Sequence, residues 1–149
     1  MFSWKKTKSN VEEFDQPMLS ELNGEHREFI AGCLGLADGA GVDLEDPGSV
    51  AEFYDLLLGA WQSSPDGTTD PEPYINAAGV AFGEHLVRTT PLRWVVAEDS
   101  TGRELAVHSE RTNFFVYPLD AVQKRWVRGE GGEFITTLAG QVVSHFKIY

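Results

Sequence analysis

The stretch that decides the fold reads Leu92-Arg-Trp-Val-Val-Ala97, Glu98-Asp-Ser-Thr-Gly102 and Arg103-Glu-Leu-Ala-Val-His108. Its first and last segments are rich in β-branched and other apolar side chains, which is typical of strands. The segment between them is polar and ends in glycine, a residue suited to a tight reversal of the chain. We therefore predict a β-hairpin, with Gly102 at a positive φ.

Successive side chains of a strand point to opposite faces of a sheet, so the hairpin should have two different faces. Four apolar side chains share the face expected to meet helices: Trp94, Val96, Leu105 and Val107. Three polar side chains share the other face, which we expect to be partly open: Arg93, Glu104 and His108.

The segments around the hairpin extend this pattern. A third short strand is predicted over 113–117, after a polar turn. The segment before the hairpin, about 71–89, is apolar almost all round and reads as a central buried helix, in which Gly79 and Gly83 allow another backbone to approach closely. We predict an α+β fold, with a small three-stranded antiparallel meander and about five helices packed mainly on one face.

Apolar residues at helical spacing predict the other helices. One stripe runs from Leu19 to Leu34, and another follows a capping box formed by Ser49 and Glu52. Further helices are expected over 118–128 and about 134–146.

The chain has 149 residues, enough for one domain of ordinary size. We expect a flexible arm over 1–16 and a single domain over 17–149. Within that domain, 17–69 is helical and 70–149 holds the helix–hairpin–helix part.

The net charge of −11 is unevenly placed. Residues 1–78 hold 15 acidic and 4 basic side chains, whereas residues 79–149 hold 8 of each. The acidic half reads either as a solubilising face or as a docking surface for a basic partner. It disfavours nucleic-acid binding, which needs a surplus of Lys and Arg.

The start of the chain is basic but lacks the apolar core of a signal peptide, and no run is long and apolar enough to span a membrane. A single cysteine, Cys33, fits a reducing compartment. We therefore expect a cytoplasmic protein without a membrane contact, in which Cys33 is buried and unreactive.

Motifs for metal or cofactor binding are missing. The four histidines fall on four different predicted elements, and no paired His or Cys spacing is present. Nucleophile motifs of the Gly-x-Ser-x-Gly type and phosphate-binding glycine loops are also missing. We expect no metal, no cofactor and no catalytic residue.

Two groups of polar residues remain as candidate binding sites. The first surrounds the hairpin: Glu84, His85, Arg93, Trp94, Asp99, Glu104 and His108. Glu and His could act there as general acid and base if a cleft displaced their pKa values. Alternatively, Arg93 and Glu104 form a cross-strand ion pair with a structural role only. The second group is the cationic face Lys124, Arg125 and Arg128, either a solvated face or a contact for an anion or acidic partner.

Several short motifs occur in a characteristic order: Gly79-Val-Ala-Phe-Gly-Glu-His-Leu-Val87, Arg93-Trp-Val-Val96, Glu98-Asp99, Gly102, Glu104-Leu-Ala106, Pro118-Leu119 and Lys124-Arg-Trp126. In this order they resemble the bacterial family catalogued as domain of unknown function 3806, over about residues 60–149. The resemblance implies a bacterial module without an assigned activity and lends no catalytic residue.

Together these observations favour a non-catalytic protein-interaction module. Its partner would be another protein or, in a homodimer, a second copy of the chain. The alternative is a small-ligand-binding protein or enzyme, with a cleft between helix 71–89 and the 92–108 hairpin.

Overall fold

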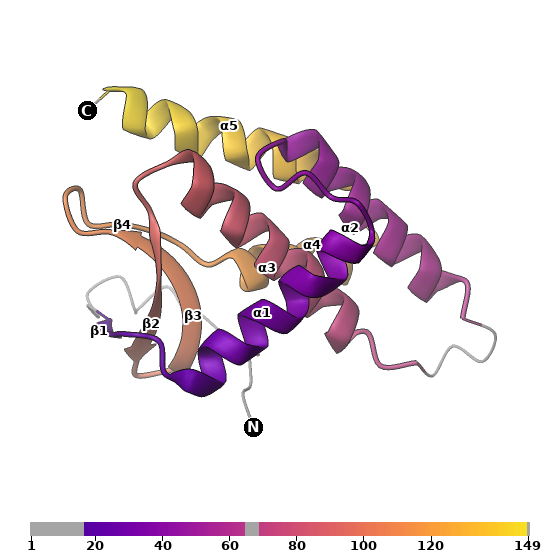
Figure 1. The fold of residues 1–149 in the computed structure, drawn as a ribbon, viewed down its shortest axis with the longest axis horizontal. Helices are drawn as coiled ribbons and strands as arrows, with labels where there is room; N and C mark the ends of the chain where they lie inside the picture. Colours follow the sequence, from indigo (N-terminus) through magenta and orange to yellow (C-terminus); the bar gives the residue numbers. More distant parts are fainter. Residues whose placement is uncertain (1–16, 65–68, 149) are drawn as a thin grey trace.

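A computed structural model describes residues 17–64 and 69–148 of the chain (Figure 1). The arm expected over 1–16 lies outside the described residues. The elements, in chain order, are β1 (Met18–Ser20), α1 (Gly24–Gly39), α2 (Pro47–Gln62), α3 (Glu72–Thr89), β2 (Arg93–Asp99), β3 (Gly102–Ser109), β4 (Phe114–Val116), α4 (Pro118–Trp126) and α5 (Glu133–Ile148).

The fold is α+β, as expected, but the sheet has four strands rather than three. Its order is β1-β2-β3-β4, with every neighbouring pair antiparallel. The added strand is β1, in which Leu19 lies opposite Ala97 of β2. The prediction that a helical stripe starts at Leu19 is therefore wrong. Leu19 and Leu22 have the spacing of a helical stripe, but the backbone at Leu19 pairs with β2 in the sheet.

The hairpin has the predicted faces. Trp94 lies opposite Val107 and Val96 opposite Leu105, on the face that packs against the helices. Gly102 has a φ of +132°, a region that favours glycine, as predicted. The opposite face is less open than expected: Glu104 and His108 are only 2% and 3% exposed.

Helix α3 occupies the centre of the molecule. Figure 1 shows it crossing the middle of the fold, and it contacts the other four helices as well as β2 and β3. A Cβ atom placed at Gly79 would lie 2.8 Å from Leu119 Cγ, and one at Gly83 would lie 2.9 Å from Pro118 and overlap the Trp94 ring. The predicted close approach of another backbone is therefore confirmed at Gly79, by Leu119, whereas the atoms close to Gly83 belong to side chains.

The helix starts differ in part from the predictions. Helix α1 begins at Gly24, after an Asn23 cap. Helix α2 is capped by Asp46, whose Oδ1 accepts from Gly48 N at 2.9 Å, and not by the expected Ser49. The Ser49 hydroxyl instead accepts from the backbone N–H of Asp43 at 2.8 Å, because the loop before α2 folds back over it.

None of the described helices has the length and apolar character needed to cross a membrane.

Candidate functional site

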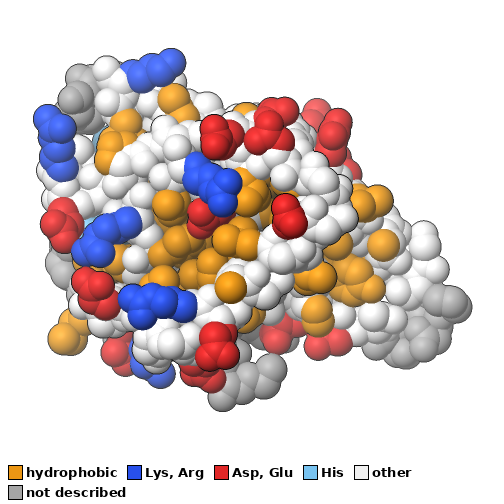
Figure 2. All heavy atoms as spheres, in the orientation of Figure 1, with side chains coloured by type: hydrophobic (Ala, Val, Ile, Leu, Met, Phe, Trp, Pro, Cys, Tyr) orange, Lys and Arg blue, Asp and Glu red, His pale blue; other side chains and the backbone are white. Residues whose placement is uncertain are grey.

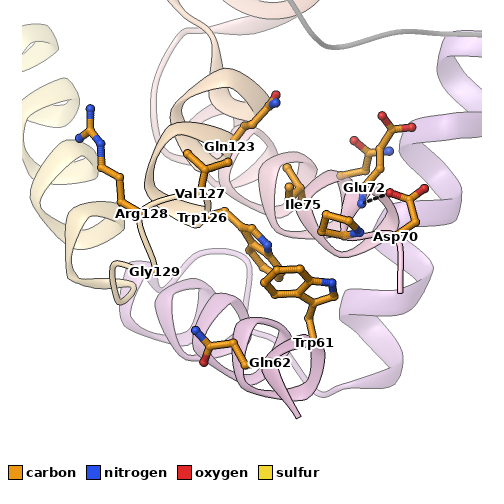
Figure 3. Close-up of a pocket in the computed structure, with 12 residues that line it drawn as sticks. Trp61, Gln62, Asp70, Glu72, Ile75, Gln123, Trp126, Val127, Arg128 and Gly129 are labelled. Atoms are coloured by element: carbon orange, nitrogen blue, oxygen red, sulfur yellow. Dashed lines mark hydrogen bonds between the residues drawn. The ribbon is translucent and has the colours of Figure 1, made fainter. Parts of the chain in front are cut away.

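Three helix ends enclose a pocket on the side of the molecule away from the sheet, with a volume of about 600 Å³. We call it the tryptophan pocket (Figure 3). It is lined by the end of α2, the start of α3 and the end of α4, through Trp61, Gln62, Asp70, Pro71, Glu72, Ile75, Asn76, Gln123, Trp126, Val127, Arg128 and Gly129.

Local sequence signals place these three helix ends. Asp70 Oδ1 accepts from Glu72 N at 3.0 Å, which fixes the turn that leads into α3. Gly129, at a φ of +70°, turns the chain after α4, and Gly129 N donates to Trp126 O at 2.9 Å. These hydrogen bonds fix the backbone at the start of α3 and at the end of α4. The residues there that line the pocket are therefore held in defined positions.

The floor of the pocket is aromatic. The Trp61 and Trp126 ring centroids are 5.8 Å apart, and the two indoles lie side by side in Figure 3. Trp126 also contacts Tyr54 edge to face at 5.7 Å and stacks on Tyr74 at 6.2 Å. Trp61 donates from its indole nitrogen to Thr69 O at 2.8 Å.

Two polar atoms in the pocket lining are unusual. Trp126 Nε1 and Asn76 Oδ1 are buried, and neither has a hydrogen-bond partner among the described residues. One is a donor and the other an acceptor. Buried polar groups are nearly always hydrogen-bonded in folded proteins, so these two atoms are candidate contacts for a group that enters the pocket.

Charged side chains lie at the pocket on both sides. Asp70 and Glu72 come from the start of α3, and Arg128 comes from beyond α4. Arg128 is largely exposed and approaches Glu130 at 3.4 Å. Val127 lies between these groups and is 72% exposed, one of the most exposed large apolar residues of the described chain.

The residues predicted around the hairpin are brought together only in part, and mostly for structural contacts. Glu84 Oε1 accepts from the Trp94 indole at 3.0 Å, and its Oε2 pairs with Arg88 at 3.0 Å. His85 is buried, and its Nδ1 lies 2.8 Å from Leu44 O. The contact between α3 and the hairpin is filled here, since the Trp94 ring covers Gly83.

The remaining hairpin residues are separated from one another. Arg93 lies opposite His108 and Glu104 opposite Ala97, so the expected Arg93–Glu104 pair does not form. Arg93 instead approaches Glu110 at 3.1 Å and Glu21 at 3.8 Å.

His108 and Asp99 serve local structure. The ring of His108 lies over Phe115 at 4.4 Å, with Nε2 3.0 Å from Asn113 Oδ1. Asp99 Oδ1 accepts from both the N–H and the hydroxyl of Thr101, which fixes the hairpin turn.

The three cations predicted to share one face make different contacts, and Arg128 lies beyond the end of α4. Lys124 pairs with Asp120 at 3.0 Å, and the Arg125 guanidinium lies 5.2 Å from the Phe134 ring centroid. Arg128 alone reaches the tryptophan pocket.

The charge asymmetry of the sequence persists in the fold. In Figure 2 the Lys and Arg side chains gather on the left, over the sheet, while the right-hand half of this face carries Asp and Glu. Up to residue 78, the described chain has eleven carboxylates and a single Lys or Arg, namely Arg27.

Neither cysteine nor metal chemistry is supported by the described residues. Cys33 is 8% exposed, and burial raises the pKa of its thiol to about 11, which disfavours the reactive thiolate. No group of three or more His, Cys, Asp or Glu side chains in 17–64 and 69–148 is placed to hold a metal ion.

Sequence reasoning missed the tryptophan pocket. Trp61 and Trp126 lie at apolar positions of predicted helices, and Asn76 lies within a helix that is apolar almost all round. The available signal was the position of each tryptophan, in the last turn of a helix just before a polar or glycine-rich loop.

Comparison with known proteins gives one finding. The model of a family described as "Domain of unknown function (DUF3806)" matches residues 63–136, which confirms the resemblance seen in the sequence. Neither the curated proteins nor the solved structures provide a match.

Proposed function

We propose that this chain, which belongs to the DUF3806 family through residues 63–136, is a non-catalytic interaction module that binds another protein at the tryptophan pocket. The observation that carries this proposal is an apolar pocket of about 600 Å³ whose lining holds two buried polar atoms without partners among the described residues. Pockets of this size and character are typical of binding sites.

The positions of the candidate acid–base groups support a role without catalysis. Glu84, His85 and His108 each make a contact that holds one element to another or fixes a turn. A general acid or base must reach a substrate proton, whereas Glu84 and His85 bind protein groups and His108 is buried with one ring nitrogen at Asn113.

The surroundings of the pocket favour a protein over a free small molecule. An exposed apolar residue, Val127, lines the pocket together with charged residues of both signs, Asp70 and Arg128. Protein interfaces combine an apolar centre with a polar rim in this way. The buried Cys33 thiol suits a reducing compartment, and we place the interaction in the cytoplasm.

Site-specific photo-crosslinking in cells tests this proposal. A photoreactive side chain replaces Val127 in one variant and Leu36 in a control. Both residues are exposed and lie at the ends of helices, but only Val127 lines the tryptophan pocket.

We expect a discrete crosslinked protein from position 127 that is absent from position 36. A second copy of the chain as that protein would identify the partner as a homodimer. Identical products from both positions, or none from position 127, would contradict the proposal.

A further inference from the structure

We infer that the tryptophan pocket receives an apolar side chain of the partner together with its backbone amide. In this arrangement the Trp126 indole N–H donates to the peptide carbonyl, and Asn76 Oδ1 accepts from the peptide N–H. The inference rests on the proposed function, since it names the part of a protein partner that enters the pocket.

The two buried polar atoms carry the argument. Trp126 is 2% exposed, and its Nε1 can only donate a hydrogen bond. Asn76 Oδ1 can only accept one. Leaving either atom unpaired in the interior costs free energy, so a group that satisfies both is bound more favourably than one that satisfies neither.

Complementarity favours an uncharged group that carries both a donor and an acceptor, such as an amide. A carboxylate offers acceptors without a donor, and an ammonium group offers donors without an acceptor. A peptide unit supplies one C=O and one N–H on neighbouring atoms, and every segment of a protein partner carries such units. Burial of an ion beside these neutral atoms would also lack a compensating charge.

The walls select the side chain that accompanies the amide. Trp61, Ile75 and Val127 line the pocket, and Ile75 is buried whereas Val127 is exposed. An aliphatic or aromatic side chain placed between them removes apolar surface from water. Trp126 Nε1 and Asn76 Oδ1 are buried, so side chains of the lining must move before a bound group reaches them.

Nuclear magnetic resonance of the full ¹⁵N-labelled chain tests this inference with capped single residues. The probe is N-acetyl-leucine methylamide, and a first control is N-acetyl-glycine methylamide, which keeps both amides but lacks the side chain. A second control is methyl 4-methylpentanoate, an ester with a carbonyl but no N–H. The readout is the Trp126 indole N–H signal, assigned among the signals of the four tryptophans by single Trp4→Phe, Trp61→Phe and Trp94→Phe variants.

We expect the leucine probe to move the Trp126 indole signal and both controls to bind more weakly. Asn76→Leu should weaken binding of the leucine probe roughly tenfold, the effect of losing one hydrogen bond to a buried group. Gln141→Leu makes a similar amide-to-alkyl change on the exposed surface of α5, outside the pocket, and should leave the affinity unchanged.

Three outcomes would overturn the inference: an unmoved Trp126 signal at the highest probe concentration, equal binding of ester and amide, or equal affinities of the Asn76 and Gln141 variants. The wild-type titration decides the matter even if Asn76→Leu fails to fold. Probe binding without a crosslinked protein at position 127 would refute the proposed partner but keep the pocket chemistry. Crosslinking without probe binding would refute the pocket chemistry but keep the proposed protein partner.

Discussion

At the scale of single residues, His26 shows how one side chain sets a helix start. Asn23 Oδ1 accepts from His26 N, and His26 Nδ1 accepts from Asn23 N, each at 2.9 Å, so the pair forms a capping box. Only a neutral imidazole leaves Nδ1 free to accept. The buried position of His26, followed by the charge of Arg103, lowers the pKa of its imidazole.

This lowered pKa predicts a loss of stability in mild acid. As the pH falls below about 6.5, the ordinary histidine value, the unfolded chain takes up a proton that the folded protein resists. The free energy of unfolding should therefore decrease with falling pH in this range. Urea unfolding at several pH values between 7.5 and 5.0 measures the effect.

His26→Gln provides the matched control, because glutamine keeps an acceptor at the third helix position but does not titrate. We expect the variant to lose less stability than the wild type over the same range. An identical pH dependence of the two proteins would exclude His26 as its source.

At the scale of elements, α3 is held by close packing rather than by helix propensity. Ten of its residues are buried, including both internal glycines, and the Gly83 position faces Trp94 and Pro118. Glycine inside a helix costs up to about 1 kcal/mol relative to alanine, a cost that close contact can offset. The packing of α3 therefore fixes which residue types its central positions accept.

Two glycine-to-alanine substitutions distinguish the effect of close packing on stability from the effect of helix propensity. Gly83→Ala should destabilise the protein by about 1–3 kcal/mol because the added methyl group overlaps Trp94, and Gly83→Leu should cost at least as much. Gly32→Ala, in α1, meets no atom within 4 Å and should stabilise by roughly 0.5–1 kcal/mol. Thermal or chemical unfolding measures both, and a stabilised Gly83→Ala variant would refute the packing of α3.

At the scale of the whole molecule, the helical first half and the family-matched segment share one core. A single cluster joins buried residues of α2, including Phe53 and Tyr54, to residues of α3, β3, α4 and α5. Tyr54 also donates its hydroxyl to Glu130 O at 2.7 Å, and Asp55 Oδ1 accepts from Gly132 N at 2.7 Å. Helix α2 therefore completes the structure that the family model covers only from residue 63.

A fragment of residues 63–149 should consequently fail to fold on its own. Removing α2 exposes the Trp126 and Ile135 side chains, which are 2% and 0% exposed in the full chain, and each large apolar side chain uncovered costs about 1.5–3 kcal/mol. We expect no cooperative thermal transition in the fragment, compared with a cooperative one in the full chain. A cooperative transition of the fragment would mean that the family segment is an independent domain.

The sequence by itself determined the local structure. The apolar period and the glycine-ended turn predicted the hairpin and its two faces, and Gly79 predicted the close approach of another backbone to α3. These features could be predicted because alternation, helical spacing and turn chemistry act between residues a few positions apart.

Only the tertiary structure decided which distant segments meet. Strand β1 pairs with a strand almost eighty residues later, and the tryptophan pocket joins ends of α2, α3 and α4. The burial of Glu104 and His108, the separation of Arg93 from Glu104, and the unpartnered atoms of Asn76 and Trp126 follow from the same long-range packing. Such contacts depend on how whole faces fit together, and the periodicity of a single segment carries no information about its neighbour across the core.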